Sequence, residues 1–400
     1  MPSNLIFINA REANLKRRIR EHLKELGYGK DENGRLLPPD LTKETYRKIH
    51  GHQRVEKIER NKDFINRNHA KLLKYFARGD EIIPAFIRSR ISLVRSGTLE
   101  SDLFRFASLY WRIPVSEGYG RRIRFLVWDD SNGKLIGIFA LGDAVFNLKA
   151  RDEKIGWSHQ DRMSSLINLM DAYVMGAIPP YNMLLGGKLV ACLIRTQEVV
   201  DVFREKYKDS TGIISGQKRD AHLLAVTTTS ALGRSSIYNR LRLAGLPYFS
   251  SLGFTSGWGH FHIPEDLFDE MRAYLVEKKD DYASSFEFGG GPNWRLRTIK
   301  KVLAALGLSA DLAQHGLVRE VFFCEIATNA IECLQAKTAN PIYGDLLSAS
   351  EVSNLAIERW IAPRALRNDE YLHWCPTEFM QHIDPCSHFT VSQNNVLRKE

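Results

Sequence analysis

The segment 166–263 constrains the fold more than any other part of this chain. An apolar run at 166–174 has the character of a strand, and a Gly-Gly turn then opens a helical stretch at 186–207. A second apolar run follows at 222–228, then a polar turn, and residues 254–263 alternate like another strand. Strands that alternate with helices in this order predict an α/β protein built around a sheet.

The remainder of the chain predicts a basic helical beginning and a helical end. Residues 11–26 place their apolar side chains on one helical face, and a long basic helix is expected over residues 42–77. After a glycine-rich break, helices are expected at 294–306, 318–334 and 349–360. We therefore expect a basic helical region at 1–90, an α/β domain at 91–285 and a helical region at 286–400.

The positive charge of the chain is concentrated at its beginning. Residues 1–90 contain 21 Lys and Arg against 12 Asp and Glu, whereas the rest of the chain contains 35 of each kind. Concentrated positive charge attracts nucleic-acid phosphates through counterion release, so nucleic acid, DNA first of all, is an expected partner. A solvated helical face is the alternative. The candidate contacts are Lys16, Arg17, Arg18, Arg20, Lys57, Arg60, Arg67 and Lys71.

Cysteine usage and hydropathy indicate the compartment. The five cysteines are few, odd in number and widely spaced, which is typical of a reduced cytoplasm. No apolar run reaches the roughly 18 residues of a membrane span, so no membrane partner is expected. His260 and His262 share the spacing of a chelating pair, but no third ligand is evident, and neither a metal site nor a cofactor is expected.

Two polar segments are candidates for binding an anion. The block 227–240 follows an apolar strand and combines arginines with small polar side chains, which suits phosphate and suits turn formation equally. The Gly-Gly turn before the 186–207 helix offers free backbone amides, with a plain tight turn as the alternative. The candidate residues are Gly186, Gly187, Lys188, Arg234, Ser235, Ser236, Asn239 and Arg240.

Several motifs together resemble one bacterial family. They include Gly118-Tyr119-Gly120-Arg121-Arg122, Met170-Asp171-Ala172-Tyr173-Val174, the block from Thr227-Thr228-Thr229 to Asn239-Arg240 and Gly257-Trp258-Gly259-His260. With them the chain resembles, over nearly its full length, the A component of the Druantia anti-phage defence system. The resemblance implies a defence component that acts beside other Druantia subunits, including a large helicase-like protein. It brings no settled catalytic residues.

A more distant resemblance is to the acyl-CoA N-acyltransferase superfamily, which implies that type of mixed sheet for the α/β domain. In that superfamily a glycine-rich turn holds the coenzyme A pyrophosphate, and a tyrosine acts as general acid. Here Met183 and Lys188 depart from the turn pattern, and Phe249 stands near the tyrosine position. Asp171 and Tyr238 are the remaining catalytic candidates.

These departures favour a non-catalytic subunit that recognises or loads nucleic acid. An acyltransferase-like enzyme that modifies nucleic acid or a partner protein is the alternative. The apolar faces at 318–334 and 349–360 are the expected docking region for other subunits, or else the core of their own domain.

Overall fold

The computed structural model describes residues 10–32, 36–117, 120–208, 210–211, 218–219, 221–278, 280, 294–338, 340–344 and 346–383. The chain forms two compact units. The first unit combines residues 1–54, 231–233 and 255–319, and the second combines residues 55–230, 234–254 and 320–400. Each unit therefore draws on more than one of the three ranges expected from the sequence.

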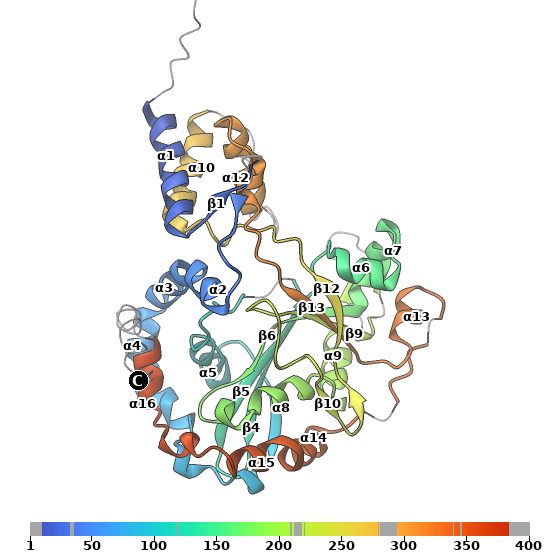
Figure 1. The fold of residues 1–400 in the computed structure, drawn as a ribbon. Coiled ribbons are helices and arrows are strands. Elements are labelled where there is room, and N and C mark those ends of the chain that lie inside the picture. Colours follow the sequence, from blue (N-terminus) through green and yellow to red (C-terminus); the bar gives the residue numbers. More distant parts are fainter. Residues whose placement is uncertain are drawn as a thin grey trace, which may run out of the picture. The chain divides into compact units, whose positions relative to one another are not determined.

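The first unit is a small helical body. Helices α1 (Ala10–Glu25), α10 (Glu265–Glu277) and α12 (Trp294–Ala305) lie side by side (Figure 1). Leu15, Ile19 and Leu23 of α1 enter the same core as the apolar side chains of the other two helices. The unit also contains α2 (Lys43–Ile49), the hairpin β1 (Gly29–Lys30) and β2 (Leu36–Leu37), and the 3-10 helix η6 (Ala310–Ala313).

The second unit is built on a seven-stranded mixed sheet of order β12-β13-β9-β6-β5-β4-β3 (Figure 1). Neighbouring strands are antiparallel except for the pair β6 and β9, which is parallel. This arrangement confirms the expected α/β class. The strands are β3 (Ser89–Leu93), β4 (Arg122–Asp129), β5 (Lys134–Asp143), β6 (Leu169–Ala177), β9 (Ala225–Thr229), β12 (Ser250–Phe254) and β13 (Glu320–Glu325).

Helices pack against both faces of this sheet and bury apolar side chains on each. One core cluster joins the sheet to α8 (Gly186–Leu193), α9 (Gln197–Tyr207) and α14 (Ala349–Ala356). A second involves α4 (Lys62–Leu72), α5 (Leu99–Ala107) and α16 (Thr377–Ile383). A third lies under α6 (Lys149–Ile155) and α13 (Ala330–Leu334).

The other elements are short or join the larger ones. Helix α3 (Gly51–Arg60) crosses the boundary between the two units at Arg54. The rest are η1 (Leu73–Tyr75), η2 (Gly79–Glu81), η3 (Pro84–Phe86), α7 (His159–Ser165), η4 (Leu166–Asn168), η5 (Tyr181–Leu184), the π-helix η7 (Ile357–Ile361), α15 (Ala362–Ala365), η8 (Glu370–His373), and the two-residue strands β7 (Ser210–Thr211), β8 (Lys218–Arg219), β10 (Arg242–Leu243) and β11 (Leu246–Pro247).

Three sequence predictions about elements were wrong. The segment 318–334 contains strand β13, and only its end is helical. The long helix expected at 42–77 is divided into α2, α3 and α4, partly because the Asn61 side chain donates to the Lys57 carbonyl. Residues 255–263 form no strand, and Gly257 among them has a left-handed backbone with φ of 71°, which lies outside the extended region that a strand requires.

Candidate functional site

A polar pocket lies where β12 meets β13, at the edge of the sheet. It has a volume of about 550 Å³, within the usual range of about 300–1,000 Å³ for ligand sites. Four of its lining residues belong to the block 227–240 that the sequence singled out, and two come from the strands. The lining residues are Arg234, Ser236, Asn239, Arg240, Phe254 and Glu320.

The two strand residues face each other across the sheet edge. Phe254 of β12 pairs directly with Glu320 of β13, so their side chains project from the same face. Glu320 is only 7% exposed, whereas Phe254 is 46% exposed. The carboxylate of Glu320 accepts hydrogen bonds from Asn239 Nδ2 at 3.2 Å and from Ser251 Oγ at 2.9 Å. The pocket therefore has a buried acceptor at its base and an aromatic ring at its rim.

The two arginines of the pocket carry its positive charge. Both are exposed, and neither guanidinium has a hydrogen bond or an ion pair within the described part of the chain. Arg240 has a left-handed backbone, with φ of 64°. Ser235, in contrast, is used locally, since its Oγ accepts from the amides of Ile237 and Tyr238 at 3.1 Å each.

The Gly-Gly pair at the start of α8 is closely packed. A side chain on Gly186 would come within 2.6 Å of the Tyr181 carbonyl oxygen, so the close backbone approach explains this glycine. The ammonium of Lys188 lies 5.5 Å from the centre of the Trp360 ring, a cation–π contact. Gly187 is partly exposed at the start of the helix. These contacts agree with a plain tight turn, and anion binding at the turn stays a prediction.

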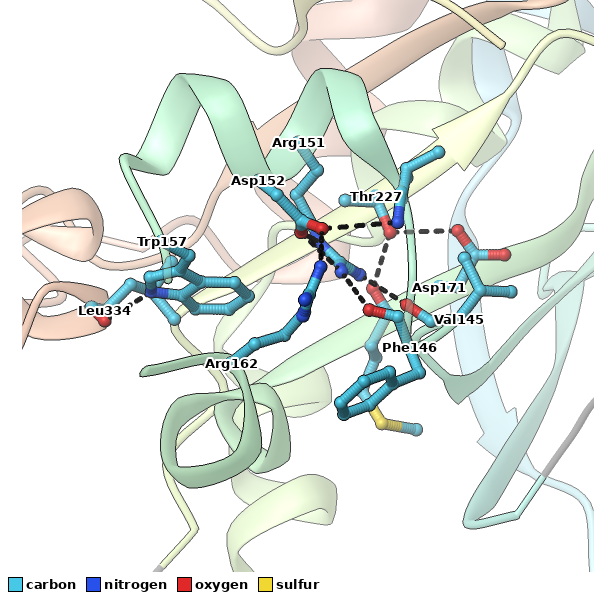
Figure 2. Close-up of polar contacts among 11 residues, drawn as sticks. Val145, Phe146, Arg151, Asp152, Trp157, Arg162, Asp171, Thr227 and Leu334 are labelled. Carbon is cyan, nitrogen blue, oxygen red and sulfur yellow. Dashed lines mark hydrogen bonds and ion pairs between the residues drawn. The ribbon is translucent and has the colours of Figure 1, made fainter. Parts of the chain in front are cut away.

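Asp171 is bonded to Thr227 beside the buried polar network of Arg151, Asp152 and Arg162, as Figure 2 shows. The Asp171 Oδ1 accepts a hydrogen bond from Thr227 Oγ1 at 2.9 Å. Burial raises the pKa of Asp171 to about 6, although the Thr227 bond and the Arg151 charge each act to lower it. Arg151 is fully buried, donates to the carbonyls of Val145 and Phe146, and pairs with Asp152. The bonds of Arg151 hold residues 145 and 146 to the first turn of α6, whereas the Thr227–Asp171 bond joins the paired strands β6 and β9.

Tyr238 lies on the other face of the sheet from Asp171. Asp171 and Thr227 are paired in register and belong to the face that α6 covers. Tyr238 packs on Phe322 and is hydrogen-bonded to Thr228, both of which project toward the α8 face. Burial raises the pKa of Tyr238 to about 12. The structure therefore does not bring the two catalytic candidates together on one side of the sheet.

The basic candidates of residues 1–90 are divided between the units. In the first unit, Arg18 is engaged in ion pairs with Asp266 and Glu270 of α10. In the second unit, Lys57 donates from Nζ to the Val115 carbonyl at 2.5 Å, and burial lowers its pKa to about 8. Lys16 is partly exposed; the remaining candidates, Arg17, Arg20, Arg60, Arg67 and Lys71, are exposed.

Sequence reasoning located four of the six residues that line the pocket. Arg234, Ser236, Asn239 and Arg240 stood out because polar residues followed an apolar strand. Glu320 was missed because the segment 318–334 was expected to be helical. Phe254 was missed because the sequence does not show which strand pairs with the strand that contains it. The apolar residues at 318–334 and 349–360, expected as a docking region, are largely buried in the cores of the second unit.

The described residues contain no group of three or more His, Cys, Asp or Glu side chains that could hold a metal ion. Within those same residues, no helix has both the length and the apolar character that crossing a membrane requires.

The fold and the pocket define an α/β protein with a mixed sheet, whose edge pocket contains two arginines that have no partner among the described residues. The sequence model of the family described as Druantia protein DruA matches residues 40–336. A Druantia protein DruA from Escherichia coli (strain UMEA 4076-1) is 52% identical over 373 residues, which are 93% of this chain and 92% of the relative. The chain therefore belongs to the DruA family of Druantia proteins. No solved structure matches it, so the acyltransferase-like architecture stays a prediction.

Proposed function

We propose that this protein is a component of a bacterial anti-phage defence system of the Druantia type. Within it, the protein contacts nucleic acid, DNA first of all, as a non-catalytic recognition or loading subunit. Membership of the DruA family supports the defence role. The exposed arginines Arg234 and Arg240, which line a pocket and have no partner in the described chain, support the contact with nucleic acid.

The chemistry of the pocket favours a phosphate-bearing ligand. A guanidinium recognises phosphate through several N–H donors in a fixed plane, and its charge is retained at any cellular pH. Exposed arginines contribute little to folding when they make no ion pair, so these two side chains are free to serve binding. Ser236 and Asn239 add uncharged donors to the same pocket.

The test is the binding of labelled single-stranded and duplex DNA, measured by fluorescence anisotropy. We expect Arg234→Ala with Arg240→Ala to weaken binding at least about tenfold, since a hydrogen bond to a charged group contributes about 1.5–3 kcal/mol. The melting temperature should stay unchanged. Arg242→Ala is the matched control, because Arg242 is exposed nearby but does not line the pocket. Unchanged affinity of a folded double variant would refute the proposed contact.

A second candidate function is acyl transfer to nucleic acid or to a partner protein. The observation that favours it is Asp171, whose pKa of about 6 suits a general base near neutral pH. The separation of Asp171 from Tyr238 by the sheet weighs against it. Calorimetric titration with acetyl-coenzyme A distinguishes the two proposals: we expect no heat of binding, and a stoichiometric complex would favour the enzyme.

A further inference from the structure

The pocket between β12 and β13 offers three different chemistries to one ligand. Arg234 and Arg240 provide positive charge, Phe254 provides an exposed aromatic face, and Glu320 provides a buried acceptor. A ligand that satisfies all three carries a negative group, a flat ring and hydrogen-bond donors. Every nucleotide has a negative phosphate and a flat base. The donors that can bind the Glu320 acceptor differ from base to base.

The strand register brings the ring and the carboxylate within reach of one base. Directly paired residues on antiparallel strands have Cβ atoms about 4.5–5.5 Å apart, and Phe254 and Glu320 form such a pair. Aromatic side chains bind unpaired bases by stacking, which contributes about 1–3 kcal/mol for each base. A base stacked on Phe254 therefore has Glu320 beside it.

Glu320 has acceptor capacity left for a ligand. An ionised carboxylate has about four lone-pair positions, and Asn239 and Ser251 occupy two of them. A buried carboxylate is costly unless donors surround it, so a ligand that brings further donors is favoured. The two arginines of the pocket repel a cationic ligand, so the donors must belong to a neutral group.

Among the bases, guanine has the matching edge. Its N1–H and its 2-amino group are adjacent donors that meet the two oxygens of one carboxylate. Adenine and cytosine place an acceptor beside their amino group, and thymine and uracil flank one N–H with two carbonyls, which a carboxylate repels. Double-stranded DNA uses this guanine edge for pairing, so only an unpaired guanine presents it.

We infer that the pocket binds an unpaired guanine nucleotide of a nucleic-acid strand, with Phe254 stacked on the base, Glu320 accepting from N1–H and the 2-amino group, and Arg234 and Arg240 at the phosphate. This inference rests on the proposed contact with nucleic acid and names what that contact recognises. A free guanine nucleotide has the same chemistry, and the experiment separates these two sources.

The experiment measures the affinity of the full chain for short oligo-dT strands that carry one central dG, dA, dC or dT. We expect the dG strand to bind about 5- to 100-fold more tightly, the discrimination typical of a paired set of hydrogen bonds to one base. Glu320→Gln should abolish this preference. Glu325→Gln is the matched control, because Glu325 lies on the same strand outside the pocket and should leave the preference intact.

A second variant keeps the inference testable if Glu320→Gln does not fold. Phe254 is exposed, so Phe254→Leu should leave the melting temperature unchanged. The variant should bind the dG strand several-fold more weakly, because the stacking on the aromatic ring is lost. Guanosine monophosphate should displace the dG strand better than adenosine monophosphate does. If the free nucleotide binds more tightly than the strand, guanine remains the ligand and the free nucleotide is its source.

Equal binding of all four strands, with loss of binding in the Arg234→Ala, Arg240→Ala variant, would overturn the guanine assignment and leave the proposed contact standing. A dG preference that Glu320→Gln leaves unchanged, or a folded Phe254→Leu protein with full affinity, would overturn it as well. Strand binding that does not depend on the two arginines would refute the proposed function itself.

Discussion

Asp171 shows how one residue in a sheet can be polar for a structural reason. Its carboxyl is held by Thr227 and lies near the buried charge of Arg151, yet burial still raises its pKa to about 6. A carboxyl whose pKa is higher in the folded state binds more protons there than in the unfolded chain. Its contribution to stability is therefore lost as the pH rises from about 4 to about 6.

The first prediction follows from this sign. Asp171→Asn keeps an acceptor for Thr227 and removes the buried charge, so it should stabilise the protein near neutral pH. The gain in the free energy of unfolding is at most about 3 kcal/mol, because each unit between the ordinary pKa of an aspartate, about 4, and the pKa of about 6 in the folded protein corresponds to about 1.4 kcal/mol. Urea unfolding at about pH 4 and about pH 7 measures it, with Asp269→Asn, at an exposed aspartate, as control. A destabilised Asn variant at neutral pH would show that the ionised carboxylate is needed.

For single residues, the sequence predicted which positions in the pocket are polar but not the face of the sheet on which they lie. The polarity of Arg234, Ser236, Asn239 and Arg240 was visible because these residues follow an apolar strand. The face on which Tyr238 lies was not, because that depends on which strands pair and in which register. The carboxylate of Glu320 completed the pocket only once β13 was placed beside β12.

At the scale of elements, β13 and α1 illustrate two kinds of ambiguity. The run Val321-Phe322-Phe323-Cys324 is apolar throughout, and a short apolar run does not distinguish a buried strand from a helix. The helix α1 was predicted correctly from its periodicity, but the pattern carried no information on its partners. Its neighbours α10 and α12 lie more than two hundred residues away in the sequence.

The partners of α1 determine how its charge must be tested. Deleting residues 1–90 removes Leu15, Ile19 and Leu23 from the core shared with α10 and α12, so such a protein loses its fold together with its charge. Arg17→Glu with Arg20→Glu changes only exposed side chains. If this helix contributes to nucleic-acid binding, the double variant should weaken it in anisotropy titrations with no change in melting temperature. Unchanged affinity would show that Arg17 and Arg20 belong to a solvated helical face and do not contact nucleic acid.

The helical first unit should be sensitive to mild acid. Burial lowers the pKa of His50 and His315 to about 3 and that of His262 to about 4, with the Arg319 charge adding to the effect on His50. These rings stay neutral in the folded unit while the unfolded chain takes up protons. Stability is therefore lost as the pH falls from about 6.5 toward about 4.

Hydrogen exchange, corrected for its intrinsic pH dependence, measures this second effect of pH. Between about pH 7 and about pH 5, the amides of α10 and α12 should lose more than about 1 kcal/mol of protection. This loss is smaller than the total destabilisation that the lowered pKa values of His50, His262 and His315 permit over that range. The strands β4 and β5 of the second unit serve as the internal reference. Equal loss in both units would show that the histidines do not control the acid response.

At the scale of the whole molecule, we propose that this chain needs other subunits to protect a cell. Its sequence contains no Gly-x-x-x-x-Gly-Lys-Ser/Thr phosphate loop, so it offers no such means of coupling ATP to movement on DNA. The helicase-like protein implied by the family resemblance would supply that step.

Phage plating on cells tests the dependence on other subunits. Cells that carry this gene alone should be as sensitive as cells without it, whereas the whole operon should protect. The operon with Arg234→Ala and Arg240→Ala should lose protection, and the operon with Arg242→Ala should keep it. Full protection by the single gene would contradict the role of a subunit.

The salt dependence of binding tests the central claim most directly, namely that the pocket arginines contact phosphate. Each phosphate neutralised on a single strand contributes about 0.7 to the slope of log affinity against log salt concentration. We predict that Arg234→Ala with Arg240→Ala lowers the magnitude of this slope by about 1.4, and that Arg242→Ala leaves it unchanged. An identical slope for the wild-type protein and the folded double variant would contradict the account.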